Sequence, residues 1–117
     1  MSNELLVLDR TLALSRVGGD EDLLREIAEL FLEDYPNLVE KIKDAVLARD
    51  AQGLERASHS LKGSVANFGA EPAYLAAMEL ERMGRSKDLR NVDSAYKKLD
   101  ENLKLLRPEL QALAKGE

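Results

Sequence analysis

The chain has 117 residues, 44% of them hydrophobic and 33% charged, which fits one globular domain rather than a disordered segment. Its net charge of −5 disfavours a nucleic-acid-binding module and a protein that docks on an anionic membrane, because both need a basic surface. The absence of cysteine excludes thiol catalysis, disulfides and thiolate metal sites, and the single histidine excludes a multi-histidine zinc site.

The apolar residues favour a helical protein with no membrane-spanning segment. Leucine and alanine dominate them, and only 4% of the chain is aromatic, which favours packed helices over a β-sandwich. No apolar run approaches the ~20 residues of a membrane span, and the opening MSNELLVLDR lacks the pattern of a signal peptide. We therefore expect a cytoplasmic protein.

The first predicted element is a short helix over residues 9–17, capped by Asp9 and ended by the two glycines that follow. Asp20 is the expected N-cap of a second, long helix. Apolar residues recur through that helix at helical spacing: Leu23, Leu24, Ile27, Leu30, Phe31, Leu38, Val39, Ile42 and Val46. Pro36 lies within this stripe and is expected to kink the helix rather than split it, because the stripe continues on both sides.

Asp50 can cap a third helix, which Gly69 is expected to end. The core face of this helix consists of Leu54, Ala57, Leu61, Val65 and Phe68. Pro72 fits the first turn of a fourth helix, which is expected to run to about Met83 and to stop at Gly84. The inner stripe of the fourth helix consists of Ala73, Ala76, Leu80 and Met83.

The last predicted helix has a seven-residue apolar repeat, and Pro108 is expected to bend or break it near its end. The repeat consists of Val92, Leu99, Leu106 and Leu113, with Tyr96, Leu103 and Leu110 between them. Because the connections are short, neighbouring helices should be antiparallel. The sequence thus predicts an all-α protein: an antiparallel up-and-down four-helix bundle with a short N-terminal capping helix. A monomer is favoured, although the repeat also fits a homodimeric coiled coil.

His59, the only histidine, lies on the third predicted helix. At about 100° per residue, it falls about 160° from the centre of the core face, and Gly63 falls on the same exposed side. The ring should therefore point to water rather than into the core. An ordinary surface histidine is the alternative.

The residues around His59 are small, apart from one lysine. A glycine inside a helix costs ~1 kcal/mol relative to alanine, which an ordinary solvent-exposed face gives no reason to accept. A face that a partner must approach closely gives a reason to accept this cost, because glycine adds no side chain. Ser60, Ala66 and Asn67 also add little bulk. Lys62 can place its ammonium near a group on the imidazole, although alone it would be a solvated lysine. The pattern suits a histidine that receives an anion from a docked partner.

Residues 59–64, HSLKGS, followed by Gly69 and Ala70, resemble the signature of histidine-containing phosphotransfer (HPt) domains. The segments GGDEDLL, at residues 18–24, and LERMGR, at 80–85, also fit that family, as does the spacing from Phe31 to Pro36. The resemblance covers about residues 9–110, so the whole chain, 1–117, is expected to be a single HPt-like domain.

The resemblance implies that His59 accepts and donates a phosphoryl group and that Lys62 stabilises that group. The implied partners are response-regulator receiver domains that carry a phospho-aspartate, together with a hybrid histidine kinase. The family relays phosphate between receivers and has no kinase activity of its own, so we expect neither an enzyme nor a cofactor. The receiver, rather than this chain, would bind the Mg²⁺ that transfer needs.

The resemblance also implies contacts on the fourth helix. Related proteins have a polar residue beside the histidine, and Glu81 occupies the matching position, where it can accept a hydrogen bond from the other ring nitrogen. Arg85 matches a basic position near the docking surface. Alternatively, either residue could lie in solvent at the end of a surface helix without a functional role. The expected partner-binding residues are Ser60, Gly63, Ala66, Asn67, Glu81 and Arg85.

Two other functions compete with a phosphorelay intermediate. A phosphate-independent adaptor could sequester a receiver through the same helical face, although it would not need the imidazole. The phosphate-accepting segment of a kinase is a second alternative, but the chain has no room for an ATP-binding domain and no glycine-rich nucleotide loop. Whether this is a free-standing protein or a module of a hybrid kinase stays open.

Overall fold

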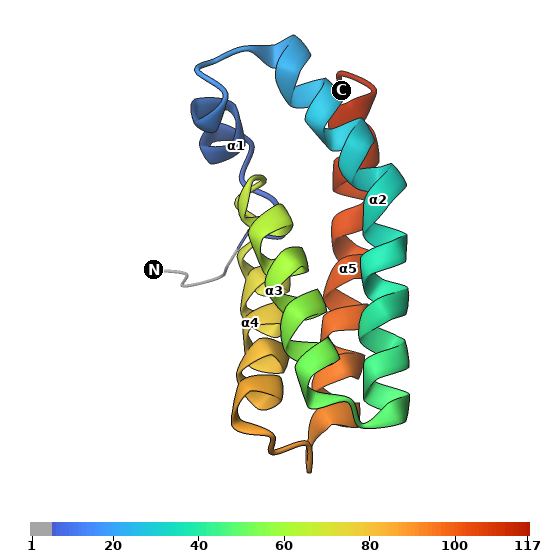
Figure 1. Ribbon diagram of the computed structural model, residues 1–117. Helices are drawn as coiled ribbons and strands as arrows, with labels where there is room; N and C mark the ends of the chain where they lie inside the picture. Colours follow the sequence, from blue (N-terminus) through green and yellow to red (C-terminus); the bar gives the residue numbers. More distant parts are fainter. Residues whose placement is uncertain (1–5) are drawn as a thin grey trace.

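The computed structural model describes residues 6–117, which form five α-helices and no strand (Figure 1). The helices are α1 (Arg10–Arg16), α2 (Glu21–Ala48), α3 (Ala51–Ala66), α4 (Glu71–Ser86) and α5 (Val92–Ala114). The predicted all-α class is therefore confirmed. None of the helices formed by the described residues is long and apolar enough to cross a membrane.

Three aspartates begin the first three helices as the sequence predicts. The side chains of Asp9, Asp20 and Asp50 each accept a hydrogen bond from the backbone N–H three residues further on, at 3.0–3.1 Å. Each bond satisfies a donor that the first turn of a helix leaves without a partner. Gly18 and Gly19 have positive φ angles, 65° and 82°, and let the chain turn from α1 into α2.

Helix α2 is one continuous helix that contains Pro36, and its axis changes direction along its length (Figure 1). On its inner face Phe31 stacks on Tyr35, with ring centroids 5.1 Å apart, and also contacts Phe68 at 5.4 Å. Leu23 and Leu30, which are among the apolar residues that recur at helical spacing, are 41% and 58% exposed. At about 100° per residue, both lie at the edge of the apolar stripe rather than at its centre.

Helix α4 does not stop at Gly84 but continues to Ser86, where Lys87, with a left-handed φ of 60°, ends it. Gly84 is buried against α3. A Cβ atom there would lie 2.6 Å from the carbonyl oxygen of Ala51 and 2.7 Å from the backbone nitrogen of Glu55. This glycine therefore permits two helix backbones to approach each other and does not terminate a helix.

Helix α5 runs without interruption through Pro108, so of the two predicted outcomes, a bend or a break, the break does not occur. Pro108 is exposed, so the Lys104 carbonyl that lacks its helical donor can bind water instead. The residues of the seven-residue repeat face inward and are buried, except for the half-buried Tyr96: Val92, Leu99, Leu103, Leu106, Leu110 and Leu113.

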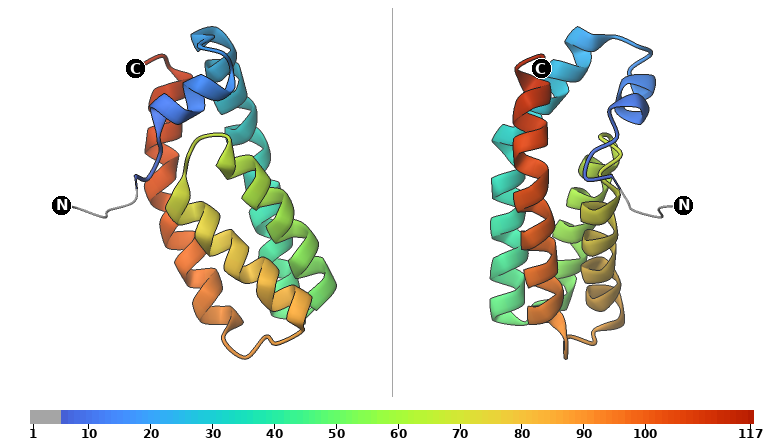
Figure 2. Two further views of the ribbon diagram at one scale, coloured as in Figure 1. Left: turned by 90° about the vertical axis from the view of Figure 1, so that its left-hand side faces the viewer. Right: turned by 180° about the vertical axis from the view of Figure 1, so that it is seen from behind.

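The four long helices share one core. Helices α2 and α4 each pack against both α3 and α5, and α1 contacts α2 (Figure 2). The N–H of Asp9 donates to the carbonyl of Phe68 at 2.9 Å, which ties the start of α1 to the turn after α3. Because α3 packs against both α2 and α4, one of its faces is buried. The opposite face, which carries His59, is open to solvent.

Candidate functional site

His59 projects from the middle of α3, and 67% of its side chain is exposed. The helix is anchored through its other face, where Leu54, Leu61 and Val65 are fully buried. This confirms the exposed position that the helix geometry predicts. The ring is thus held by a rigid element at the surface.

Beneath the ring lies Glu81 of α4, whose side chain is only 4% exposed. Its Oε2 lies 2.7 Å from Nδ1 of His59, and its Oε1 lies 2.7 Å from Nζ of Lys62. An ionised carboxylate only accepts hydrogen bonds, so Nδ1 carries the proton and donates it. In the neutral ring, Nε2 then keeps its lone pair, and no residue in 6–117 makes a hydrogen bond to it.

The hydrogen bonds around Glu81 keep its carboxylate ionised. Burial acts to raise the pKa of Glu81, but hydrogen bonds from Lys62 and His59, together with their charges, outweigh it and lower the pKa. A buried charge is tolerated when it is paired in this way. The site therefore presents a fixed negative charge to the inner nitrogen of the imidazole.

Arg85 completes the surroundings of Glu81. Its Nη2 donates to Glu81 Oε2 at 3.0 Å, and its Nε donates to Oε2 of Glu55 on α3 at 3.0 Å. The hydrogen bond to Glu55 and the charges of both carboxylates raise the pKa of Arg85. Residues 6–117 contain no group of three or more His, Cys, Asp or Glu side chains placed to hold a metal ion.

The exposed face of α3 has little side-chain bulk on the C-terminal side of His59, whereas the long side chain of Arg56 is exposed one turn before it. A Cβ atom added at Gly63 would meet nothing within 4 Å, so no contact among residues 6–117 requires glycine there. Ser60 is exposed, and its hydroxyl donates to the carbonyl of Arg56 in its own helix. Asn67 is exposed and Ala66 half-buried at the end of α3. A partner could approach this face closely.

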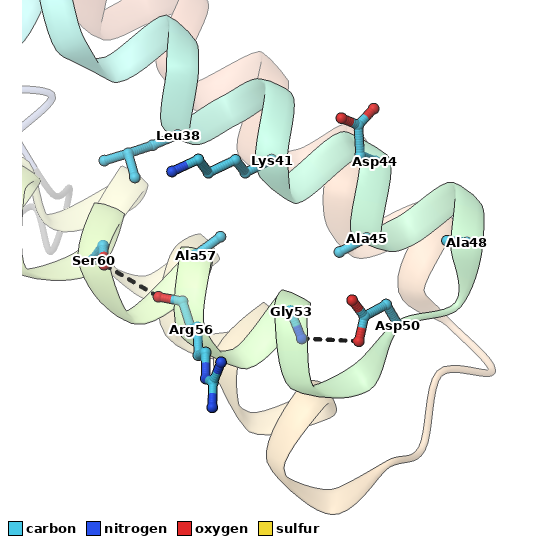
Figure 3. A pocket seen from close by; sticks show the side chains of 10 residues that line it. All are labelled: Leu38, Lys41, Asp44, Ala45, Ala48, Asp50, Gly53, Arg56, Ala57 and Ser60. Carbon is cyan, nitrogen blue, oxygen red and sulfur yellow. Dashed lines mark hydrogen bonds between the residues drawn. The ribbon is translucent and has the colours of Figure 1, made fainter.

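An open groove of about 500 Å³ lies between α2 and α3 beside this face (Figure 3). Its lining includes Ala45, Ala48 and Ala57; the side chain of Lys41 extends into the space between the two helices, whereas that of Arg56 points away from α2. Ser60 lines the groove, whereas His59 does not. The groove therefore adjoins the histidine without enclosing it, and the imidazole lies on an open surface.

Residues 26–116 match the sequence model of the family described as the Hpt domain. The chain belongs to this family. Among curated proteins, none matches this HPt chain in sequence.

Two solved structures resemble the HPt chain in fold. The histidine-containing phosphotransfer protein HptB of Pseudomonas aeruginosa PAO1 is 23% identical, with a TM-score of 0.87 over 97% of this chain and 99% of that one. The HPT domain of a sensor hybrid histidine kinase from Shewanella is 19% identical, with a TM-score of 0.84 over 97% and 98%. HPt domains are phosphocarrier modules that act with receiver domains and hybrid kinases in phosphorelays.

The HPt fold brings together three residues that the sequence singled out, His59, Lys62 and Glu81. Glu81 is buried, so it is neither the solvated end of a surface helix nor a contact open to a partner. Arg85 is 65% exposed, but its hydrogen bonds hold it against Glu81 and Glu55. Ser60, Gly63 and Ala66 lie on the same helix as the histidine, as predicted, and Asn67 is the C-cap residue of that helix.

Glu55 is the side chain at this site that sequence reasoning missed. A weak signal was present, since Glu55 precedes His59 by four residues and Arg85 follows Glu81 by four. Such spacing places each pair on one side of its helix. The spacing alone does not predict that the two pairs meet, because this depends on the register of α3 against α4.

Proposed function

We propose that this chain is a phosphorelay intermediate that carries a phosphoryl group on Nε2 of His59. The observation that carries the proposal is the exposed imidazole whose Nδ1 is hydrogen-bonded to the buried carboxylate of Glu81. This bond favours the tautomer in which the outward nitrogen is the nucleophile. Membership of the HPt family supports the same assignment.

The phosphoryl group would come from the phospho-aspartate of a receiver domain. The lone pair of Nε2 attacks phosphorus, an N–P bond forms, and the bond from phosphorus to the aspartate oxygen breaks. The aspartate carboxylate leaves with that electron pair, and the imidazole ring gains positive charge. Glu81 stabilises the positive charge of the ring through the hydrogen bond that it accepts from Nδ1–H, as a carboxylate does for other catalytic histidines. Transfer to a second receiver is the same step in reverse.

Lys62 supplies a cation close to this reaction, because its ammonium binds the same carboxylate of Glu81 as His59. In the unphosphorylated chain its ammonium is paired with Glu81, and 21% of the side chain is exposed. It can therefore turn toward phosphoryl oxygens on His59 without crossing the core. Transfer of a phosphoryl group depends mainly on positioning and charge stabilisation, which is the role we assign to Lys62.

We infer that receiver domains dock on the exposed face of α3, over Ser60, Gly63, Ala66 and Asn67, and along the groove beside α2. The open space at Gly63 and the small side chains support this surface. A hybrid histidine kinase would supply one of these receivers. The chain itself would have no kinase activity and no cofactor, and the receiver would bind the Mg²⁺ needed for transfer.

We further infer that residues 1–117 form a single domain, in which α2–α5 make an antiparallel up-and-down bundle capped by α1. Short connections and the packing of each long helix on two others support this topology, and successive long helices run in opposite directions in Figure 1. We expect a monomer, because the apolar repeat of α5 faces inward and packs against the other helices of the same chain. The cytoplasmic location stays a prediction of the sequence.

Phosphate transfer to His59 tests the proposal. Receiver domains labelled on their aspartate are mixed, with Mg²⁺, with the wild-type chain and with His59→Gln. We expect acid-labile label on the wild type only, and its passage to a second receiver, while circular dichroism shows equal helix content. Label on His59→Gln would contradict the assignment. Receiver binding with no label on either protein would favour the phosphate-independent adaptor.

A further inference from the structure

Three successive hydrogen bonds connect Glu55 of α3 to His59, four residues later on the same helix, through two side chains of α4. Glu55 Oε2 accepts from Arg85 Nε at 3.0 Å, and Arg85 Nη2 donates to Glu81 Oε2 at 3.0 Å. The same Oε2 accepts from His59 Nδ1 at 2.7 Å. The oxygen that orients the ring is thus also the oxygen that Arg85 holds.

These contacts fix both oxygens of one carboxylate. Lys62 holds Oε1, while Arg85 and His59 share Oε2, so the plane of the carboxylate of Glu81 cannot turn freely. Arg85 is itself 65% exposed and would be mobile without a second contact. Because a guanidinium is rigid and planar, anchoring its Nε at Glu55 also directs its Nη2.

The backbones of the two helices approach each other closely beside this pair. A Cβ atom at Gly84 would lie 2.7 Å from the backbone nitrogen of Glu55 and 3.0 Å from its Cα. Arg85 is the next residue along α4. The distance over which Arg85 reaches Glu55 is therefore set by direct contact between the helices.

We propose that Glu55 and Arg85 form a positioning pair that holds the carboxylate of Glu81 against Nδ1 of His59 and thereby sets the tautomer and orientation of the ring for transfer. This inference rests on the proposed function of His59. Exposed ion pairs add little to stability, so the pair is expected to act on the histidine rather than on folding. Arg82 and Glu79 of α4 provide a control, because they too are an exposed arginine–glutamate pair, and their side chains form a hydrogen-bonded ion pair with each other rather than with His59 or Glu81.

The first test uses the free protein and needs no partner. Nitrogen-15 NMR of His59 is recorded at neutral pH for the wild type, Glu55→Gln, Arg85→Gln and Arg82→Gln. We expect mainly the Nδ1–H tautomer in the wild type and in Arg82→Gln. In Glu55→Gln and Arg85→Gln, a larger fraction of the Nε2–H tautomer should appear. An unchanged tautomer population in both variants would overturn the proposal, and so would an equal change in Arg82→Gln.

The second test measures transfer from a labelled receiver. The rate constant at saturating receiver should fall about fivefold in Glu55→Gln and Arg85→Gln, which corresponds to about 1 kcal/mol in the barrier. The half-saturating receiver concentration should change less than about twofold, since positioning alters the barrier rather than docking. A change in half-saturation alone would make the pair a docking contact and overturn the proposal. If the wild type accepts no phosphate, the proposed function fails, and the NMR result still decides the positioning role.

Discussion

Glu81 is a charged side chain in a buried position, and this makes the site sensitive to pH. Its carboxylate has three partners, Lys62, His59 and Arg85, each within 3.0 Å. Burial acts to raise its pKa, but the bonds from Lys62 and His59 lower it below the ordinary value of 4.5. Because the folded pKa lies below the unfolded one, ionised Glu81 stabilises the folded state above pH 4.5, and this contribution is lost as pH falls through the folded pKa.

We therefore expect Glu81→Gln to be less stable than the wild type near neutral pH, with a difference that shrinks as the medium becomes acidic. Glutamine resembles the protonated carboxyl, so the two proteins become alike once Glu81 is protonated. Urea unfolding of both proteins at a series of pH values between neutrality and pH 3 measures the difference. A difference that stays constant or grows toward acid pH would contradict the pairing of an ionised Glu81.

Lys62→Ala tests the role of the lysine. Removing its ammonium should slow phosphate transfer or shorten the lifetime of phosphohistidine, because the phosphoryl oxygens lose a nearby cation. Removing its hydrogen bond should also raise the pKa of Glu81. Timed transfer and decay of the labelled protein give both rates. Lys104→Ala is the control, because Lys104 is also paired with a carboxylate, Asp100, but lies on α5. Equal behaviour of the two variants would make Lys62 an ordinary surface lysine.

At the scale of single residues, helix geometry predicted exposure, whereas contacts between helices did not follow from the residues alone; the hydrogen bond between Glu81 and His59 was expected only from the family resemblance. The helical angle of His59 predicted an outward ring, because that angle depends only on the helix that carries it. The hydrogen bonds of Arg85 depend on the register between α3 and α4, which no local pattern encodes. Glu55 was missed for the same reason.

At the scale of helices, the contact between α3 and α4 depends on a glycine. Gly84 and Gly63 both lie inside helices, yet an added methyl group would meet the backbone of α3 at Gly84 and open space at Gly63. We expect Gly84→Ala to destabilise the fold by about 1–3 kcal/mol, since the helices must separate to fit the methyl group. Gly63→Ala should stabilise it by up to about 1 kcal/mol through helix propensity alone.

Chemical unfolding of the two variants beside the wild type measures both effects. Glycine-to-alanine substitution should thus change the free energy of unfolding in opposite directions at two helical glycines of one protein. Destabilisation by Gly63→Ala would show that a contact within the chain requires this glycine. A neutral Gly84→Ala would show that α3 and α4 can separate at little cost.

If Gly63 does not serve stability, we expect it to serve docking. Replacing it with a bulky residue, such as Gly63→Gln, should weaken binding of a cognate receiver because the side chain would project over the exposed face of α3. Titration calorimetry with that receiver gives the affinity. Gln52→Leu, which changes an exposed residue nearer the start of α3, is the control. Unchanged receiver affinity in Gly63→Gln would mean that the face need not be clear.

Helix starts were easier to predict than helix ends. Aspartate caps act through their own turn, and all three predicted ones are present. Gly84 looked like a terminator because glycine often follows a helix. Its real role is to allow contact with another helix, and that contact is not a local property of the sequence. Pro108 does not break α5, because an exposed carbonyl can lose its helical donor at little cost.

Across the whole molecule, the apolar repeat of α5 is buried against the other helices of the same chain. Val92, Leu99 and Leu106 are at most 1% exposed, and Leu105 is the large apolar side chain of α5 that faces solvent. The sequence left a homodimeric coiled coil open because a repeat does not reveal its partner. We expect sedimentation equilibrium to give a monomer mass of 13.0 kDa. A concentration-dependent dimer that Leu105→Lys dissociates would contradict this expectation.

The measurement that tests the central claim most directly is NMR of the phosphorylated chain. Phosphorus-31 and nitrogen-15 spectra together identify the nitrogen that carries the phosphoryl group. We expect a single phosphohistidine at Nε2 of His59, with Nδ1 still hydrogen-bonded to Glu81. A phosphoryl group on Nδ1, or on any residue other than His59, would contradict the mechanism, because the carboxylate would then face the wrong nitrogen.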